Sequence, residues 1–350
     1  TQLSTRTLKR RKQTAISRHR RAPAAKGLSS SEEADASDLN VYLRCDARDS
    51  ADAKVLLDGL VRAVNAWQPR IGGGRTTGLG FGHVTQLTHR TFDLDTSTDL
   101  ITLATATQSG GERVDALLTS EATTAQLKPT QRDPLLTATM TIPTIGLLQE
   151  MKDVRTTHGS QWKGMLRSRV EYIARSLGHS PCIGDDPDHA QPSRQHQWTG
   201  CGTCDLCRAF GSATAAGAWE FHTMPWGDAS AHTRQRNAID RFTSGVRDGA
   251  LFEDDWVSGV TTTLTITEHH KAPGWVLVAL LHALHDLDDG LWGIGPRTAI
   301  GHGTVSMTAV RCPDVGGERP VDLEKLPAVE LPRPVDDTLA ENDMGTDQND

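Results

Sequence analysis

The sequence lacks long apolar stretches: no run among its 350 residues approaches the roughly 20 apolar residues that a membrane-spanning helix requires. Its first residues are basic, but no apolar segment and small-residue cleavage site follow them, so the sequence predicts no secretory signal. These two absences lead us to expect a cytoplasmic protein without membrane partners.

Cysteine is also scarce, with six in the chain, and four of the six gather in one segment. A disulfide framework would need many cysteines spread over a small secreted domain. The clustering instead favours a metal site in a reducing compartment. The four clustered residues are Cys182, Cys201, Cys204 and Cys207.

The net charge is −7, from 37 Lys and Arg against 44 Asp and Glu, which is not typical of a nucleic-acid-binding protein. The charge is unevenly placed, however. Residues 1–31 hold nine basic residues and no acid, whereas residues 313–350 hold eleven acids and three basic residues. The two ends therefore cancel in the average. The acidic, proline-rich end is predicted to be disordered.

The hydrophobic pattern predicts alternating strands and helices. Apolar residues recur at helical spacing in three segments, so we expect helices at 54–67, 159–178 and 275–287, with Ser160 as the N-cap of the second. Residues 107–134 read as a polar connector. Alternating or β-branched segments predict strands at 39–45, 84–95, 99–106, 135–142, 260–266 and 304–310.

Parts of the sequence repeat at a distance of about 222 residues, far above the period of a solenoid, which indicates domain duplication. The second copy has an upstream half that the first lacks, so we expect the chain to be a piece of a longer protein. The aligned pairs are 10–18 with 233–241, the helix 54–67 with 275–287, and 75–84 with 297–305, the last needing one gap that sets Arg75 opposite Arg297. The predicted domains are half a module at 1–106, a linker at 107–134, a complete module at 135–312 with an insertion at 182–207, and the tail at 313–350.

The cysteine spacing points to zinc. Cys201, Cys204 and Cys207 follow one another at intervals of three, and Cys182 precedes them. Zinc prefers four such ligands in a tetrahedron, and a closed set of four makes the site structural and not catalytic. His189 or His196 is an alternative to Cys182 as the fourth ligand. Buried free thiols are the other interpretation, but this polar, glycine-rich segment is a poor place to bury them.

Two glycine-rich loops and two basic segments are candidate phosphate-binding elements. Glycine lets a backbone approach a phosphate closely, and a helix that begins Gly-Ser offers free amides to an anion. A strand follows each loop, so the loops do not match the dinucleotide-binding fingerprint, and tight turns are the alternative. A solvated charged face is the alternative for the basic residues. The candidates are Gly80, Gly82, Gly295, Gly301 and Gly303 with Arg75 and Arg297 in the loops; Ser160, Lys163, Arg167 and Arg169 in the helix; and Arg11, Arg18, Arg234, Arg236, Asn237 and Arg241 in the repeated basic segment.

These motifs, in this order, resemble the RAMP superfamily, whose members include backbone subunits of type III CRISPR effector complexes. The matching segments are GSQWKGMLRS at 159–168, CGTCDLCRAFGS at 201–212, RNAIDRFTSGVRDGALFEDD at 236–255 and IGHGTV at 300–305. The resemblance covers 135–312 as one module and 1–105 as the back half of another, and is closest to the zinc-bearing tandem modules of types III-D and III-E.

The resemblance implies an α+β fold of ferredoxin-like (RRM-type) βαββαβ modules with a zinc insertion and a thumb-like hairpin. The implied function is antiviral: the protein holds CRISPR RNA and the target RNA paired with it, beside other effector subunits or modules. A pure scaffold, or an unrelated zinc protein whose loops hold a nucleotide, are rival interpretations.

Some members of the family also cut target RNA, using an Asp between the first strand and the Gly-Ser helix, often with a divalent cation such as magnesium. In this sequence that interval is short and holds only Glu150 and Asp153 as acids. Asp153 is therefore the candidate catalytic residue. An exposed loop carboxylate is the alternative.

Overall fold

A computed structural model describes residues 8–16, 23–34, 39–118, 121–127, 133–147, 156–182, 200–212, 215–222 and 224–332. Within these residues, no helix is both long and apolar enough to cross a membrane. The fold mixes helices with antiparallel sheets, and most of the buried residues lie in the part of the chain after residue 134.

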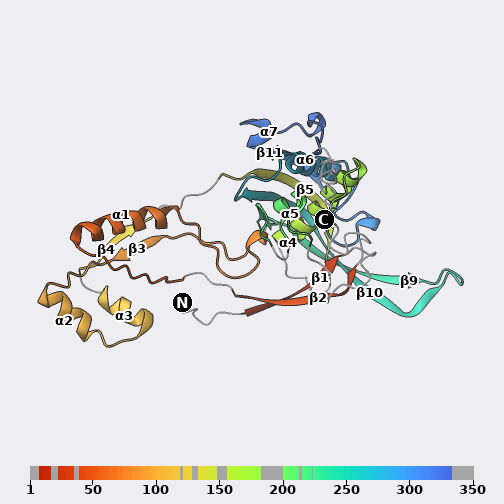
Figure 1. Cartoon of the computed structure of the whole chain (residues 1–350). Helices are drawn as coiled ribbons and strands as arrows, with labels where there is room; N and C mark the ends of the chain where they lie inside the picture. The colour runs from red at the N-terminus through yellow and green to blue at the C-terminus, as the bar shows by residue number, and fades with distance from the viewer. Residues whose placement is uncertain are drawn as a thin grey trace, which may run out of the picture.

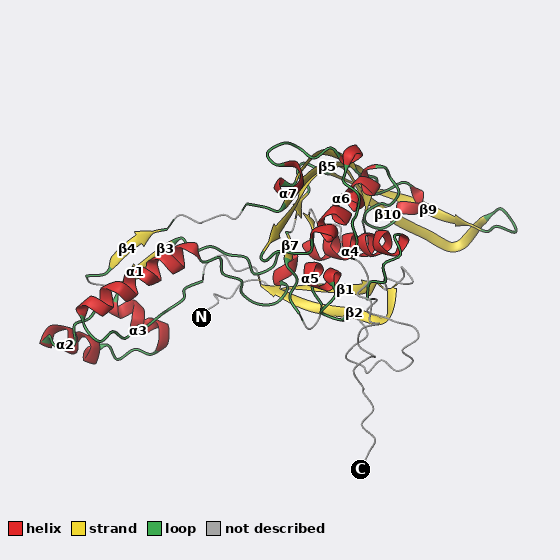
Figure 2. Cartoon of the chain, turned by 45° about the horizontal axis from the view of Figure 1, so that its top comes forward, coloured by secondary structure: helices red, strands yellow, loops and turns green. Residues whose placement is uncertain are grey.

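The main body is a five-stranded antiparallel sheet with the strand order β11-β5-β10-β7, and β9 pairs with β10 beside this path. Every second residue at the start of β5 is buried, so one face of the sheet is apolar. Helices α4 and α6 contact each other and contribute to the same core (Figure 2). The strands are β5 (Leu136–Gly146), β7 (Trp219–Phe221), β9 (Ser230–Ile239), β10 (Val246–Glu268) and β11 (Ser306–Arg311).

The two helices confirm the predicted segments 159–178 and 275–287. Helix α4 (Gly159–Ser176) buries Trp162, Leu166 and Val170 one turn apart, and α6 (Gly274–Asp288) is buried along most of its length. Ser160 is not the N-cap, because the helix begins at Gly159 and the backbone N–H of His158 donates to Gln161 Oε1 at 3.2 Å. The hydroxyl of Ser160 accepts a hydrogen bond from Arg11 instead.

Along the chain the main body runs strand, helix, strand, strand, helix, strand, as β5, α4, β7, β10, α6 and β11. A segment between α4 and β7 carries the short helix α5 (Asp205–Phe210) and the cysteines. The hairpin of β9 and β10 projects away from the sheet (Figure 1). Two short strands, β6 (Thr156–Thr157) and β8 (Met224–Pro225), pair beside the body.

The amino-terminal part contains a second hairpin and a small group of elements that lies apart from the main body (Figures 1 and 2). The helix predicted at 54–67 is confirmed as α1, whereas residues 39–45 form no strand. The elements are β1 (Leu8–Ile16), β2 (Pro23–Ala34), α1 (Ser50–Ala66), the 3-10 turn η1 (Arg75–Thr77), β3 (Gln86–His89), α2 (Ser97–Thr105), α3 (Gly110–Leu117) and β4 (Thr123–Gln126).

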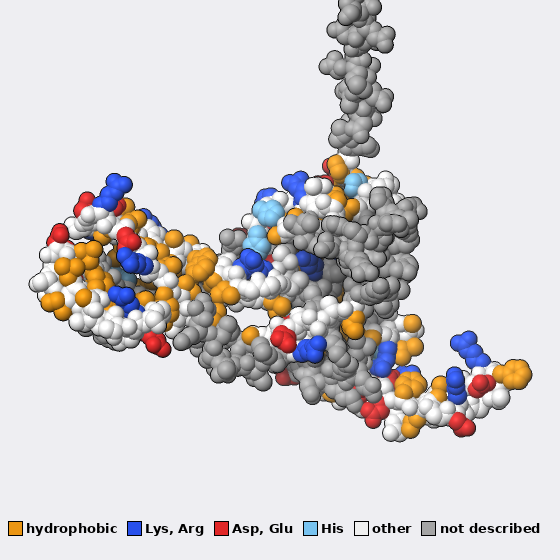
Figure 3. Space-filling view, turned by 60° about the horizontal axis from the view of Figure 1, so that its bottom comes forward, with side chains coloured by type: hydrophobic (Ala, Val, Ile, Leu, Met, Phe, Trp, Pro, Cys, Tyr) orange, Lys and Arg blue, Asp and Glu red, His pale blue; other side chains and the backbone are white. Residues whose placement is uncertain are grey.

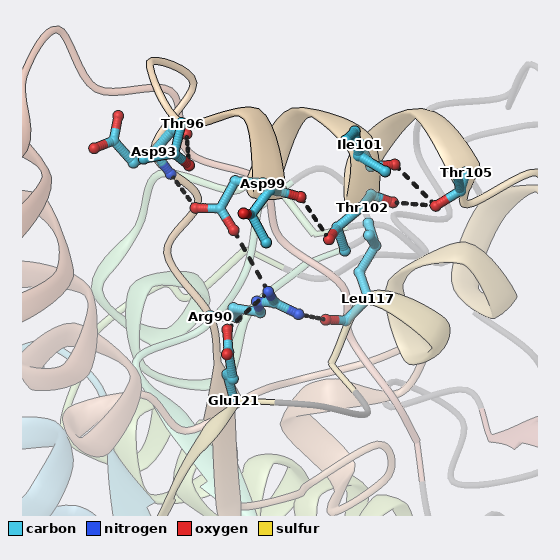
Figure 4. Close-up of polar contacts among 10 residues, drawn as sticks. Arg90, Asp93, Thr96, Asp99, Ile101, Thr102, Thr105, Leu117 and Glu121 are labelled. Carbon is cyan, nitrogen blue, oxygen red and sulfur yellow. Dashed lines mark hydrogen bonds and ion pairs between the residues drawn. The ribbon is translucent and has the colours of Figure 1, made fainter.

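The prediction of a strand at 99–106 is wrong, because these residues form α2. The β-branched residues suggested a strand, but the hydroxyls of Thr102 and Thr105 donate to carbonyls of the preceding turn at 2.8 Å, which satisfies them inside a helix. Arg90 holds this group together through Glu121 at 3.0 Å, Asp99 at 3.5 Å and the carbonyl of Leu117 at 3.3 Å (Figure 4). The supposed connector 107–134 therefore contains α3 and β4.

The acidic end departs from the predicted disorder over its first part. Residues 313–332 contain the short helix α7 (Pro313–Gly316) and the turn η4 (Leu323–Lys325), and their apolar side chains pack against the core. His282 on α6 hydrogen-bonds the carbonyl of Pro327 at 2.9 Å. Apolar residues spaced among the acids explain the difference, because they cover α6. Residues 333–350 lie outside the described residues.

The two hairpins have the same pairing register with a constant shift of 223 residues in the numbering (for example 239 − 16). Both also interrupt their register at the equivalent place. Over the described residues 10–16 and their partners 233–239, the repeat seen in the sequence is therefore a repeat of backbone structure. The matching pairs are Leu8–Ala34 with Ala231–Val257, Thr14–Leu28 with Asn237–Leu251, and Ile16–Pro23 with Ile239–Val246.

Candidate metal centre and nucleic-acid interface

The four clustered cysteines come together in space. Their sulfur atoms all lie within 4.8 Å of one another, and Cys182 Sγ lies 3.4 Å from both Cys204 Sγ and Cys207 Sγ. A tetrahedral zinc site, with Zn–S bonds of about 2.3 Å, places its sulfurs about 3.8 Å apart. Helix α5 supplies Cys207, Cys204 immediately precedes that helix, and Cys182 follows α4. The cluster can therefore hold a metal ion such as zinc.

Within the cluster, Cys207 favours the thiolate form that binds metals, whereas hydrogen bonding to the other cysteines raises the pKa of Cys182. Hydrogen bonds from Cys182 and Cys204, together with the positive charge of Arg167, hold the pKa of Cys207 below its usual range, although burial acts in the opposite direction. The alternative ligands His189 and His196 lie outside the described residues. Of the thiols the structure describes, Cys312 is buried elsewhere and Cys45 is exposed.

Two of the predicted phosphate-binding arginines on α4 are engaged inside the protein. Arg167 is buried and donates from Nε to Glu171 Oε1 at 2.9 Å, and its other nitrogens donate to the carbonyl of Gly211 and to Cys207 Sγ. Arg169 donates to Asp286 Oδ2 at 2.7 Å on α6. Arg167 is buried and Arg169 is partly buried in its ion pair, which the sequence pattern did not reveal.

The two glycine loops have one backbone shape. In the first, the N–H of Ile71 donates to the carbonyl of Gly80 at 2.9 Å; in the second, Ile294 donates to Gly303 at 3.0 Å. Both glycines have positive φ, and a Cβ at either would lie 1.9 Å from the isoleucine carbonyl oxygen, so only glycine fits. The shift is again 223 (303 − 80), without a gap. The aligned pairs are Gly72 with Gly295, Gly74 with Arg297, Gly78 with Gly301, and Gly80 with Gly303, all with positive φ.

This register corrects the sequence alignment. Arg297 corresponds to Gly74, and Arg75 corresponds to Thr298, so the two arginines are not equivalent. The gap was needed only because two arginines were matched by residue type. Gly82 follows the first loop, where its backbone N–H donates to the carbonyl of Pro69 at 3.2 Å.

The first loop lies on the start of α4. A Cβ at Gly159 would lie 2.6 Å from the carbonyl oxygen of Thr77, so the helix approaches the loop backbone to backbone. Lys163 Nζ donates to Thr76 Oγ1 at 2.8 Å. Beside the loop, Arg70 forms an ion pair with Glu220 of β7, whose side chain is fully buried. The sequence pattern did not single out Arg70 or Glu220.

A pocket opens where the first loop meets α4 and the segment after α5. Among the described residues, two basic side chains and no acidic ones line it. Burial, and then the charge of Arg167, lower the pKa of Lys163 to about 8, so the ammonium group is short of solvation there. Such a site favours an anion. The lining residues are Gly74, Arg75, Thr76, Lys163, Gly211, Ser212, Ala215, Ala216 and Gly217.

The start of α4 is also covered by the first hairpin. Arg11 donates from Nη2 to Ser160 Oγ at 3.2 Å, and its Nη1 lies 3.5 Å from Glu33 Oε1. Burial lowers the pKa of His158, whose Nε2 lies 3.8 Å from Glu33, so this histidine tends to be neutral. Arg18, the other predicted residue of this segment, lies outside the described residues.

At the base of the second hairpin, three predicted arginines converge on one carboxylate. Asp254 is 1% exposed and pairs with Arg236 at 2.6 Å, Arg234 at 3.2 Å and Arg297. Burial would raise the pKa of Asp254, but the arginines hold it below its usual range. The three guanidinium groups carry three positive charges against the single negative charge of Asp254, so these four side chains together stay positive. Asn237 is exposed farther along the hairpin.

The base of the second hairpin also holds aromatic and imidazole rings that the sequence pattern did not single out. The imidazole of His232 stacks on Trp256 with ring centroids 4.1 Å apart, and His302 lies 6.0 Å from the same indole. The strand pairing of His232 with Trp256 produces the stack, and no pattern in the sequence near either residue predicts it. The candidate catalytic residue Asp153, and Glu150 with it, lie outside the described residues.

Comparison with known proteins agrees with the resemblance over part of the chain. No curated protein matches the sequence. Residues 157–306, from just before α4 to the first residue of β11, match the family described as the RAMP superfamily. This match supports a RAMP protein with a CRISPR-associated role in RNA binding.

Proposed function

We propose that this protein is an RNA-binding backbone component of a type III CRISPR effector complex that holds the guide RNA and its paired target. The observation that carries the proposal is the pocket between the first glycine loop and α4, where Lys163 and Arg75 meet and no acid of the described part of the chain lines the walls. The family match supports RNA binding in general, and the pocket offers a place for a phosphate.

The topology supports a ferredoxin-like module. Strands β5 and β7 are joined through α4, strands β10 and β11 through α6, and each pair has a strand of the other pair between its members. This is the split βαβ arrangement of that fold. In such a module the hairpin of β9 and β10 is the thumb-like element.

The repeated hairpin and loop support the tandem organisation, with residues 1–106 as the back half of a first module. The first loop contacts the Gly-Ser end of α4 in the second module. The second loop has the same backbone shape, so it suits the equivalent helix of another module or subunit. The exposed apolar and basic side chains along the projecting hairpin fit a partner or a base (Figure 3). Exposed hairpin residues include Ile239, Phe242, Leu251 and Arg241.

Zinc is the cofactor that we propose for the four-cysteine cluster, with a structural role. Cys204→Ser is expected to abolish stoichiometric zinc and destabilise the segment around α5, because a structural zinc site contributes directly to folding. Elemental analysis of the purified protein tests this. Protein without zinc but with a disulfide between Cys182 and Cys207 would contradict it.

RNA binding is tested on the full chain purified from cells expressing a CRISPR array. We expect copurifying RNA of discrete length with a repeat-derived end. A small nucleotide would instead favour a cofactor-binding zinc protein, and the absence of both would oppose the proposal. With a single-stranded guide, Lys163→Gln is expected to weaken binding and reduce the salt slope by about 0.7. Lys325→Gln, at an exposed lysine paired with Asp322, is the control with the same charge change.

A further inference from the structure

Arg167 is a buried cation on α4 whose donors all point into the protein. It is 9% exposed, and Nε lies 2.9 Å from Glu171 Oε1. One terminal nitrogen donates to the carbonyl of Gly211, and the other donates to Cys207 Sγ at 3.2 Å. The guanidinium is therefore buried among three partners inside the protein, and one of them is a sulfur of the cysteine cluster.

Cys207 is the most deeply buried sulfur of the cluster. It is fully buried, whereas Cys201 is exposed and Cys182 and Cys204 are half-buried. Backbone N–H groups donate to the sulfurs of Cys201 and Cys182 at 3.2 and 3.4 Å, and the backbone of Gly202 donates to Cys207. Water can also reach the exposed sulfur but not the buried one. Since zinc with four thiolates is doubly negative, burial of that charge needs a compensating cation.

We propose that Arg167 is a positioning residue of the metal centre: it donates a hydrogen bond to the Cys207 thiolate and balances the charge of the metal-bound sulfurs. The inference rests on the proposed zinc site and removes Arg167 from the predicted RNA contacts. Zinc bound there supplies a cross-link between the end of α4 and α5. Groups that hydrogen-bond metal ligands orient them and tune the affinity of the site.

Packing around the contact leaves little freedom. A Cβ at Gly200, which has φ +58°, would lie 2.9 Å from Cys207 Sγ and 3.3 Å from Arg167 Nη2. Arg167 also stands one helical turn after Lys163, and its acceptor Gly211 borders the anion pocket. The same side of α4 therefore serves the metal through Arg167 and the pocket through Lys163.

The test is metal binding by the full chain, measured by competition with a zinc chelator and by the absorption of the cobalt-substituted protein. Arg167→Gln is expected to lower zinc affinity by about 10- to 100-fold. It should also move the sulfur-to-cobalt charge-transfer band to lower energy, since a lost hydrogen bond raises the energy of the sulfur lone pairs. Arg169→Gln is the matched control: it loses an ion pair on the same helix, so zinc affinity and the cobalt band should not change.

Wild-type zinc affinity and an unshifted cobalt band in folded Arg167→Gln would overturn the inference. If that variant does not fold, Arg167→Lys is measured in its place. One ammonium group cannot replace separate donors to Glu171, Gly211 and Cys207, so we expect zinc affinity to fall about tenfold. Unchanged zinc affinity in Arg167→Lys overturns the inference. Failure of the wild-type protein to bind zinc would instead refute the proposed metal site. The two failures are therefore distinguishable.

Discussion

Raising the pH from 7 to 9 is expected to weaken RNA binding through Lys163. Burial and the charge of Arg167 lower the pKa of this lysine to about 8. The charged fraction then falls from about 0.9 at pH 7 to about 0.1 at pH 9. If only the ammonium form binds a phosphate, affinity falls by up to about tenfold over this range. A bound phosphate favours the charged form, so the loss is centred somewhat above pH 8.

The effect of pH on folding stability through Lys163 has the opposite sign. The unfolded chain keeps the ordinary lysine pKa of 10.5, so between about 8 and 10.5 it binds more protons at this site than the folded protein does. The folded state therefore gains stability from this group as the pH rises through that window, while it loses affinity for anions. A loss of RNA binding in this range therefore does not require unfolding.

Fluorescence anisotropy with a labelled oligonucleotide of adenine and cytosine measures this, because those bases do not titrate in this range. Ionic strength is held constant, since it dominates such affinities. Lys163→Arg is the control: its guanidinium stays charged throughout, so its binding should be flat with pH. A wild-type affinity that does not change between pH 7 and 9, or an equal decline in Lys163→Arg, would refute the reasoning.

Two further predictions concern how the two glycine loops are held. Arg70→Met is expected to cost about 3 kcal/mol of unfolding free energy in urea titrations, because Glu220 would stay buried and, among the described residues, would keep as its ion-pair partner only His269. A change below about 1 kcal/mol would mean that the pair acts like a surface ion pair. Gly80→Ala and Gly303→Ala should each cost more than about 2 kcal/mol, since the new Cβ would meet a carbonyl oxygen at 1.9 Å, while Gly73→Ala, which meets nothing within 4 Å, should stay near zero. Thermal melts of the three variants check this, and a response of only one glycine of the pair would contradict the equivalence of the loops.

The cysteine cluster was predictable because its information is local. Cys201, Cys204 and Cys207 recur at fixed intervals, and a tetrahedral metal explains that spacing without a fold. The repeat was also visible, although residue matching placed Arg75 opposite Arg297. The backbone decided the register, because positive φ at four equivalent positions must coincide even where one residue is Arg and the other Gly.

The roles of individual arginines were not predictable. Lys163 and Arg167 read alike on a helical wheel, yet one reaches a pocket and the other is buried against a sulfur. Asp254, which forms ion pairs with three arginines, lies among other acids in the sequence, and nothing in the neighbouring sequence distinguishes it. A charge pattern states how many cations a segment has, but their partners are residues distant in sequence.

By itself, the sequence therefore determined the three long helices, the four metal-ligand candidates, the repeated segments and the RAMP resemblance, since spacing and order along the chain carry each of these. The tertiary structure decided that 97–105 is helical, that 313–332 packs on α6, and which basic residues remain available to a phosphate. Burial and ion pairing between distant segments determine these outcomes, because desolvation forces each buried charge to find a partner that the local sequence does not specify.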